Sequence, residues 1–398
     1  MNCPKAALTA GHGAQNFAGS PPAVADHQLQ NRVTTSTSFT AYSRRLLAFI
    51  ERANVAEDVE FASLACELFA LQFDQVASYR RLCEVRQVAP GTLTDWRQIP
   101  AIPTAAFKEL ELTSLLPVER TTVFHSSGTT EQFPSRHFHN AESLAVYEAS
   151  LVPWFARHVF HRYSDSKSPT HFLCLAPPPT QAPHSSLVHM FATVSHAFGA
   201  SRTGFAAIVG TDHSWSIDFA AAYGALSHAE RSGEPLLLLG TAFMFVNLLD
   251  ALSERGLFLK LPSGSRVMET GGYKGRSREL PKTELHKLIS SRLGVPRESI
   301  VCEYGMSELS SQAYSLISDR SLLPFTFPPW ARALVVSPET GREVIDGETG
   351  LLRIFDLANV RSVMAIQTED LAVRWGNGFE LLGRAAKAEP RGCSLMAA

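Results

Sequence analysis

The sequence has no long uninterrupted hydrophobic run and no cluster of basic residues. Its longest apolar stretch, residues 235–252, is broken by Gly240, Thr241 and Asn247, and it is shorter than the about 20 residues that span a bilayer. The 36 Lys and Arg against 38 Asp and Glu give a net charge of −2 at pH 7, which provides no basic field for a nucleic acid backbone. We therefore expect neither a transmembrane segment nor nucleic acid binding.

The sequence also lacks a CxxC pair and any regular cysteine spacing. Its six cysteines are scattered: Cys3, Cys66, Cys83, Cys174, Cys302 and Cys393. This distribution disfavours both a disulfide framework and a zinc site. The N-terminus lacks the basic start and apolar segment of a secretory signal. Together these absences predict a cytoplasmic protein.

Hydrophobic patterning predicts an α/β protein. Residues 1–35 are rich in small and polar residues and are predicted to form a disordered tail. From Tyr42 to about Val88, apolar residues recur every three or four positions, which predicts two or three amphipathic helices. Short apolar strands then alternate with helical stretches near 184–198, 216–230 and 241–255. This alternation is typical of a layered α/β fold with a largely parallel sheet.

Short strands separated by Gly, Asp and Asn turns follow residue 332 and predict a small antiparallel subdomain. The expected organisation has four parts: a tail over 1–35, an α/β core with a helical N-terminal part over 36–332, a β subdomain over 333–384, and a C-terminal tail over 385–398 that carries Cys393.

The most informative motif is residues 125–135, which read HSSGTTEQFPS. Gly128 allows backbone amides to converge on an anion. Four hydroxyl side chains flank it: Ser126, Ser127, Thr129 and Thr130. No Gly-Lys-Ser/Thr follows, so this is not a Walker A loop. A Ser/Thr/Gly cluster alone is more often an ordinary turn, so the phosphate-loop interpretation depends on later motifs.

Later motifs supply the remaining groups needed to join a carboxylic acid to AMP. Tyr304 offers a flat face for adenine, Ser307 a hydroxyl for the α-phosphate, and Glu308 a carboxylate for Mg²⁺. Asp370 can accept both ribose hydroxyls, and Arg384 is a forked donor. Taken in order, these residues indicate an ATP-dependent, acid-activating enzyme.

These motifs resemble those of the adenylate-forming (ANL) superfamily. The resemblance is strongest to the acyl-protein synthetases (LuxE-like) of bacterial bioluminescence operons, and it spans roughly residues 90–396. Further matching segments are IPAIP at 99–103, Phe107-Lys108, SSL at 185–187, Gly271-Gly272 and RGCS at 391–394. The resemblance implies the large N-terminal domain of adenylate-forming enzymes, with ATP and Mg²⁺ as cofactors and a hydrophobic, fatty acid as substrate.

Carried over position by position, the resemblance implies a role for each motif. The implied contacts are phosphate at Ser126–Thr130, adenine at Gly271, Gly272, Tyr304 and Gly305, α-phosphate and Mg²⁺ at Ser307 and Glu308, and ribose at Asp370 and Arg384. Cys393 matches the acyl acceptor of the family. This match implies self-acylation as a thioester, followed by delivery to a partner acyl reductase.

The sequence departs from the superfamily pattern in three places. The loop lacks the usual Thr-Gly-x-Pro-Lys ending, and the usual Thr-Gly-Asp reads Thr368-Glu-Asp370. Only residues 385–398 follow Arg384, so we expect no full mobile C-terminal domain with its lysine. Lys274 is our candidate for a replacement cation, although a solvated lysine beside Arg276 is an equally good interpretation.

Three functions remain open at this stage. The leading one is adenylation followed by loading of Cys393. The second transfers the acyl group to CoA or a carrier protein, and the third is a non-catalytic nucleotide-binding subunit.

Several conspicuous side chains have simpler interpretations. Cys302 is expected to be a small buried residue, and the His137 and His139 pair is not expected to bind a metal. Ser185 or Ser186 is expected to cap a helix. Met190, Phe243 and Phe245 are candidates for the acyl pocket, although large apolar residues are more often part of the core.

Overall fold

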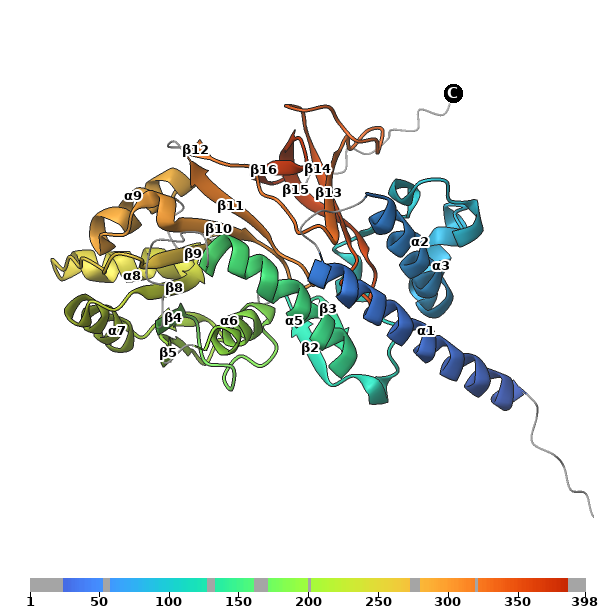
Figure 1. Cartoon of the computed structure of the whole chain (residues 1–398), viewed down its shortest axis with the longest axis horizontal. Coiled ribbons are helices and arrows are strands. Elements are labelled where there is room, and N and C mark those ends of the chain that lie inside the picture. Colours follow the sequence, from blue (N-terminus) through green and yellow to red (C-terminus); the bar gives the residue numbers. More distant parts are fainter. Residues whose placement is uncertain are drawn as a thin grey trace, which may run out of the picture.

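The computed structural model of the chain describes residues 24–52, 58–126, 133–160, 171–199, 202–272, 280–318 and 321–385, with the backbone alone for 24–37, 317–318 and 321–322. Two sheets dominate this part of the chain, and helices cover both (Figure 1). None of the described helices is both long and apolar enough to cross a membrane.

The larger sheet has the strand order β12-β11-β10-β9-β8-β4-β5. Its strands are β4 (His171–Leu175), β5 (Arg202–Phe205), β8 (Leu236–Thr241), β9 (Arg266–Thr270), β10 (Ile300–Tyr304), β11 (Ala313–Ser318) and β12 (Ser321–Leu322). The five strands from β10 to β5 are parallel to one another. β11 pairs antiparallel with β10, and β12 pairs antiparallel with β11. The prediction of a layered α/β fold with a largely parallel sheet is confirmed.

Two hydrophobic cores lie on opposite faces of this sheet. Leu236 and Leu238 of β8 belong to a core with helices α7 (Phe219–Ser232), α8 (Ala242–Glu254) and α9 (Lys282–Leu293). Leu237 and Leu239 belong to a second core with α5 (Ala141–Phe155) and α6 (Ser186–Ala197). This alternation is why buried parallel strands read as continuous apolar runs.

The structure tests two predictions about side chains in these layers, a helix cap and a set of pocket residues. Ser185 caps α6, because its Oγ accepts a hydrogen bond from the Val188 amide, as predicted. Met190 lies in the core with α6, whereas Phe243 and Phe245 lie with α8 on the other face. Because α6 and α8 pack on opposite sides of the sheet, these three residues do not share one pocket, and the structure favours their interpretation as core residues.

The smaller sheet contains the expected antiparallel strands. They are β13 (Ala331–Val336), β14 (Thr349–Asp356), β15 (Ala365–Trp375) and β16 (Gly378–Arg384). A short strand from far upstream, β1 (Ile102–Pro103), pairs in parallel with Ile366 and Gln367 of β15. The sheet thus combines a short segment at residues 102–103 with strands that all follow residue 330.

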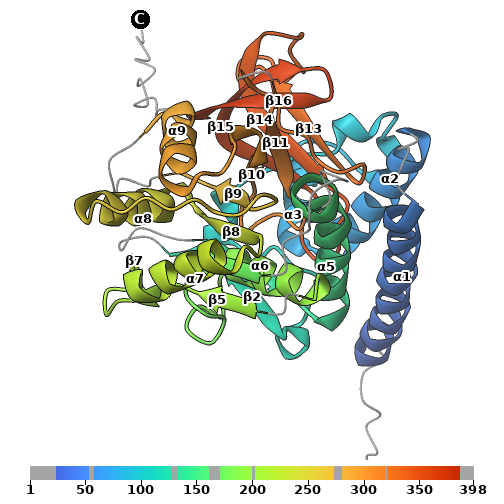
Figure 2. The same cartoon turned by 60° about the vertical axis from the view of Figure 1, so that its left-hand side comes forward.

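The N-terminal helices pack against the smaller sheet. They are α1 (Val24–Arg52), α2 (Asp58–Gln75) and α3 (Ala77–Val85), and Figures 1 and 2 place them beside β13–β16. Leu46, Phe69 and Ile354 are fully buried in one continuous core. Because this core crosses the expected boundary between residues 332 and 333, that division stays a prediction.

The expected N-terminal tail overlaps α1, which begins at Val24. The structure gives residues 24–35, where the sequence predicted a disordered tail, a helical backbone. Helix propagation costs little once a packed nucleus exists, and the buried turns from Phe39 to Ile50 supply such a nucleus. Residues 1–23 and 386–398 lie outside the described part of the chain.

Smaller elements connect these layers. They are β2 (Thr122–His125), β3 (Arg136–His139), β6 (Ala207–Val209), β7 (Trp215–Ile217), α4 (Ala106–Glu109), the 3₁₀ turns η1 (Pro90–Thr92), η2 (Trp96–Gln98), η3 (Pro117–Glu119) and η5 (Arg297–Ser299), and the π-helical turn η4 (Ala156–Phe160). Of these, the β2–β3 hairpin matters most for the candidate site.

Candidate functional site

The Ser/Thr/Gly motif is the loop of the β2–β3 hairpin. The Ser126 amide donates to the Ser135 carbonyl oxygen at 3.2 Å, and the Ser135 amide donates to Ser126 Oγ at 2.9 Å. These two hydrogen bonds close the base of the loop. The central positions, Ser127, Gly128, Thr129 and Thr130, lie outside the described residues.

The hairpin is held against the segment that carries Ser307. Ser135 Oγ lies 3.4 Å from Ser307 Oγ, and His137 Nδ1 donates to the Ser307 carbonyl oxygen at 2.9 Å. Since a carbonyl only accepts, Nδ1 carries the proton. Burial lowers the pKa of His137 to about 4 although this hydrogen bond opposes the shift, so the ring is neutral at pH 7. The structure thus brings two predicted motifs together across about half of the sequence.

Ser307 and Glu308 form an oxygen-rich pair behind this contact. Ser307 Oγ donates to Glu308 Oε2 at 3.1 Å, and both residues are only 7% exposed. Asn359 Nδ2 donates to the Glu308 carbonyl oxygen at 2.9 Å and so fixes its backbone. A carboxylate beside a hydroxyl is a donor set that suits Mg²⁺.

A buried carboxylate fixes the turn that follows Glu308. Asp356 Oδ2 accepts hydrogen bonds from the Ser310 and Ser311 amides, each at 2.8 Å. Its Oδ1 accepts from Ser311 Oγ at 2.7 Å and from the Ala358 amide at 3.0 Å. Sequence reasoning missed Ser135, Asn359 and Asp356, since no local pattern links them to residues that are about 50 to 170 positions away.

Tyr304, Asp370 and Arg384 form a second group. The Tyr304 hydroxyl donates to Asp370 Oδ2 at 2.7 Å. Asp370 pairs with Arg384 across β15 and β16, and Arg384 Nε lies 3.7 Å from Asp370 Oδ1. Burial raises the pKa of Asp370, while the hydrogen bond from Tyr304 and the charge of Arg384 oppose the increase.

The ring of Tyr304 is largely covered by protein. It packs edge-on against Phe325, Phe327 and Phe379, with interplanar angles of 62°, 90° and 81°, and the residue is 7% exposed. Its visible role is to anchor Asp370 from within an aromatic cluster. Contact with adenine stays a prediction for this side chain.

The glycines of the predicted adenine site, Gly271, Gly272 and Gly305, directly follow the neighbouring strands β9 and β10 of the larger sheet. Thr270 of β9 and Glu303 of β10 are register partners, so Gly271 and Tyr304 follow at the same level. Gly271 has φ of 71°, in the left-handed region that favours glycine. Gly272 follows it in open space.

Gly305 makes room for a buried carboxyl that sequence reasoning did not single out. A Cβ at position 305 would collide with Glu303 Oε1. The Thr270 hydroxyl donates to Glu303 Oε2. Burial raises the pKa of Glu303 to about 7, although this hydrogen bond opposes the shift. The only sequence signal for Glu303 is its position directly before Tyr304.

Two expected catalytic residues, Lys274 and Cys393, lie outside the described residues. The structure therefore assembles the Ser126, Ser307–Glu308 and Tyr304–Asp370–Arg384 parts of the predicted site. It brings them to the edge of the larger sheet where β9 and β10 end.

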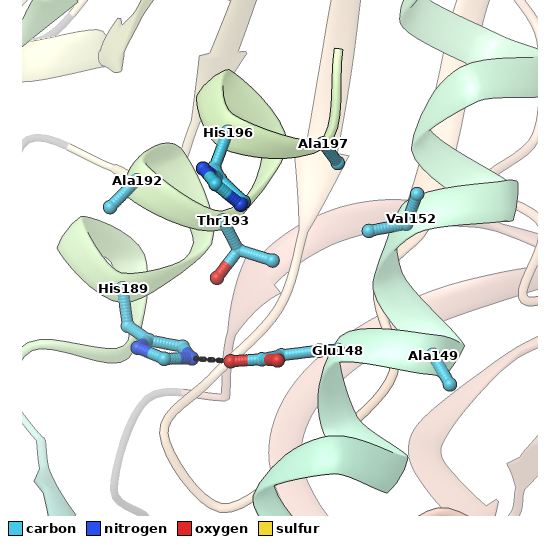
Figure 3. A pocket seen from close by; sticks show the side chains of 8 residues that line it. All are labelled: Glu148, Ala149, Val152, His189, Ala192, Thr193, His196 and Ala197. Carbon is cyan, nitrogen blue, oxygen red and sulfur yellow. Dashed lines mark ion pairs between the residues drawn. The ribbon is translucent and has the colours of Figure 1, made fainter. Parts of the chain in front are cut away.

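A separate groove of about 530 Å³ lies between α5 and α6. Figure 3 shows Glu148 and His189 facing each other across it, and their ion pair measures 3.1 Å. The other lining side chains are Ala149, Val152, Ala192, Thr193, His196 and Ala197. The ring of His189 lies 5.3 Å from Phe124 and 5.7 Å from Tyr147. Because Phe124 belongs to β2, this contact places His189 of the groove against the β2–β3 hairpin.

Comparisons with known proteins show the family and the fold of the chain. Two curated relatives are long-chain-fatty-acid--luciferin-component ligases. The Vibrio harveyi protein is 22% identical over 328 residues, which cover 80% of this chain and 82% of that protein. The Aliivibrio fischeri protein is 22% identical over 314 residues, or 78% of each chain.

Solved structures with a similar fold include 2-hydroxyisobutyryl-CoA ligase with 2-HIB-AMP in the postadenylation state. Its TM-score is 0.58 at 13% identity, covering 82% of this chain and 68% of that one. The open conformation with 2-HIB-AMP and CoA has a TM-score of 0.55 at 13% identity, covering 79% and 71%. The family model for the acyl-protein synthetase LuxE matches residues 54–398. Since this match spans most of the sequence, the chain belongs to the LuxE family of acyl-protein synthetases.

Proposed function

We propose that this chain is an acid-thiol ligase that uses ATP to activate a long-chain fatty acid as acyl-AMP and then loads the acyl group onto its own Cys393. Family membership and the activity for which the two relatives above are named support this proposal. The observation that carries it is the contact of Ser135, at the base of the loop, with Ser307, whose hydroxyl donates to Glu308.

In the first step, a carboxylate oxygen of the acid bonds to the α-phosphorus of ATP, and the bond from that phosphorus to the pyrophosphate oxygen breaks. Hydroxyls of the hairpin loop and of Ser307 would donate to phosphate oxygens. Asp370, held by Tyr304 and next to Arg384, would accept the ribose hydroxyls. Glu308 and Ser307 would hold Mg²⁺, which neutralises polyphosphate charge when bound.

In the second step, the Cys393 thiolate would attack the acyl carbonyl carbon, forming the thioester and releasing AMP. Residues 385–392 separate this cysteine from Arg384, which pairs with Asp370 in the candidate ribose site. A chain of this length spans at most roughly 30 Å, which is enough to return to the site. The thioester would then deliver the acyl group to a partner acyl reductase.

Intact-protein mass after incubation with Mg·ATP and a panel of fatty acids tests both steps. We expect a hydroxylamine-labile acyl adduct on the wild type and on the matched Cys66→Ser control. Cys393→Ser should release pyrophosphate in an acid-dependent manner without carrying the adduct. An adduct that survives in Cys393→Ser would refute self-loading at this residue.

The same assay separates the alternatives. Pyrophosphate release with transfer to added CoA or a carrier protein, and no adduct on either protein, would identify an external acceptor. No acid-dependent pyrophosphate exchange at all would favour a non-catalytic nucleotide-binding subunit.

Lys274 is proposed as the cation that neutralises charge as pyrophosphate leaves. Lys274→Ala should slow acid-dependent pyrophosphate exchange, whereas Lys287→Ala, at an exposed position on α9, should leave it unchanged. Full exchange in Lys274→Ala would remove this residue from the mechanism.

A further inference from the structure

Three fully buried side chains with metal-ligating atoms meet beneath the ends of β9 and β10. Glu269 of β9 and Cys302 of β10 are register partners, so their side chains leave the same face of the sheet. His286 of α9 packs onto that face. His286 Nε2 lies 3.4 Å from Glu269 Oε1 and 3.7 Å from Cys302 Sγ. The ligand atoms of all three residues lie within 4.8 Å of one another.

The two distances from His286 Nε2 are close to the edge length of a tetrahedral zinc site. Zinc bonds of about 2.3 Å to sulfur and about 2.0–2.2 Å to nitrogen and oxygen place neighbouring ligand atoms roughly 3.3 to 3.6 Å apart. A thiolate with imidazole and carboxylate ligands favours zinc over Mg²⁺ or Ca²⁺. Within the described residues, Glu269 Oε2 and His286 Nδ1 are buried and have no hydrogen-bond partner. The cluster therefore contains buried polar atoms that could still gain a partner.

A lysine stands where the cation would bind. Lys282 Nζ lies 3.2 Å from Glu269 Oε1. Burial opposes ionisation of Glu269, but Lys282 and His286 lower the pKa of this carboxyl to about 2. The Lys282 side chain is 30% exposed, whereas those of Glu269 and His286 are 0% exposed. Only Lys282 can turn toward solvent and open a position for an ion.

We propose that Glu269, His286 and Cys302 form a zinc-binding site from which the Lys282 ammonium group is displaced. On binding, the Cys302 S–H bond breaks, its proton goes to solvent, and a zinc–sulfur bond forms. His286 binds through Nε2 and carries its proton on Nδ1, and a water molecule completes the tetrahedron. Thiolate and carboxylate together neutralise the charge of Zn²⁺, so the site needs no further counter-ion.

The position of this site suggests a structural role. Glu269 immediately precedes Thr270 and Gly271, and Cys302 immediately precedes Glu303 and Tyr304. A shared ion would tie together the two strand ends and the first turns of α9. The cysteine spacing carried no sign of the site, because its ligands come from two strands and a helix. This proposal is independent of the proposed enzymatic activity.

Cobalt substitution tests the site on the full chain, purified without a polyhistidine tag and stripped with a chelator. We expect one bound Co²⁺ per chain, with a thiolate-to-cobalt charge-transfer band in the near ultraviolet and the strong visible bands of a tetrahedral ion. Zinc should displace the cobalt. Because a thiol proton is released, affinity should rise by about tenfold per pH unit below the thiol pKa. Absence of the charge-transfer band in the folded wild type would overturn the proposal.

Matched variants separate a metal site from a buried ion pair. Cys302→Ser should lose the charge-transfer band and bind zinc at least about tenfold more weakly, whereas Cys83→Ser, another buried cysteine in the α3 region, should behave as wild type. Lys282→Gln should bind zinc at least as tightly as wild type, because a competing cation is gone. A charge-transfer band that persists in Cys302→Ser, or loss of binding in a folded Lys282→Gln, would contradict this assignment.

Discussion

Replacing Glu303 by glutamine tests the electrostatics beneath the candidate nucleotide site. Glu303 is 5% exposed, and the Thr270 hydroxyl donates to its Oε2. Burial raises its pKa from 4.5 to about 7. Glutamine has nearly the same shape and keeps an acceptor for Thr270, but it never ionises. The variant therefore removes the charge and little else.

The sign and the magnitude follow from proton linkage. Between pH 4.5 and 7 the unfolded chain releases the Glu303 proton while the folded chain keeps it, so this residue makes stability fall as pH rises. Above pH 7 the full penalty remains. A pKa difference of about 2.5 units corresponds to about 3 kcal/mol. Glu303→Gln should thus be more stable than wild type at alkaline pH and close to wild type near pH 4.5.

Urea unfolding from pH 5 to 8.5 measures this effect. The free energy of unfolding of Glu303→Gln, minus that of wild type, should grow by roughly 2 to 3 kcal/mol over this range. Glu109→Gln is the matched control, since Glu109 is exposed on α4, and its difference should be flat. A flat difference for Glu303→Gln, or one that shrinks as pH rises, would refute the assigned cause.

Other variants test single contacts by the same unfolding assay. His137→Gln should lose less stability than wild type between pH 7 and 4. Burial lowers the pKa of His137 to about 4, so between pH 7 and 4 the unfolded chain binds a proton that the folded chain lacks. This difference costs wild type up to about 3 kcal/mol. Equal losses of stability in the variant and in wild type would contradict this cause. Gly305→Ala should lose about 1–3 kcal/mol through its collision with Glu303, whereas Gly272→Ala, in open space, should stay within about 1 kcal/mol of wild type; equal effects would exclude the collision as the cause. Asp356→Asn should lose about 2–4 kcal/mol, because an NH₂ group would face donors that the carboxylate now accepts from; a neutral effect would show that these hydrogen bonds are dispensable.

Local patterns predicted most of the helices and strands. A helix was expected near residues 241–255, and α8 begins there, directly after β8, with Thr241 as its N-cap. A serine cap for α6 was also expected, and Ser185 provides it. Such features depend on neighbouring residues, so spacing alone reveals them. The α1 helix shows the limit of local reasoning, since its first turns follow from a packed nucleus further along the chain.

Contacts between distant segments were beyond sequence reasoning. The pairing of β1 with β15 depends on strand order and register, which no short window records. The hydrogen bond from His137 to Ser307 likewise joins a hairpin to a turn 170 residues away. Sequence motifs named Ser307 as functional but left His137 without a role.

By itself, the sequence determined the α/β class, the order of the candidate adenylation motifs and the resemblance to acyl-protein synthetases, because each is carried by residues close together in the chain. Only the tertiary structure decided which side chains are buried together. It placed the Tyr304 hydroxyl in a hydrogen bond to Asp370 and buried Glu303, which raises the pKa of that carboxyl. It also brought Glu269, His286 and Cys302 together in one cluster. Burial and charge are properties of packed neighbours, and packing follows from the fold of the whole chain.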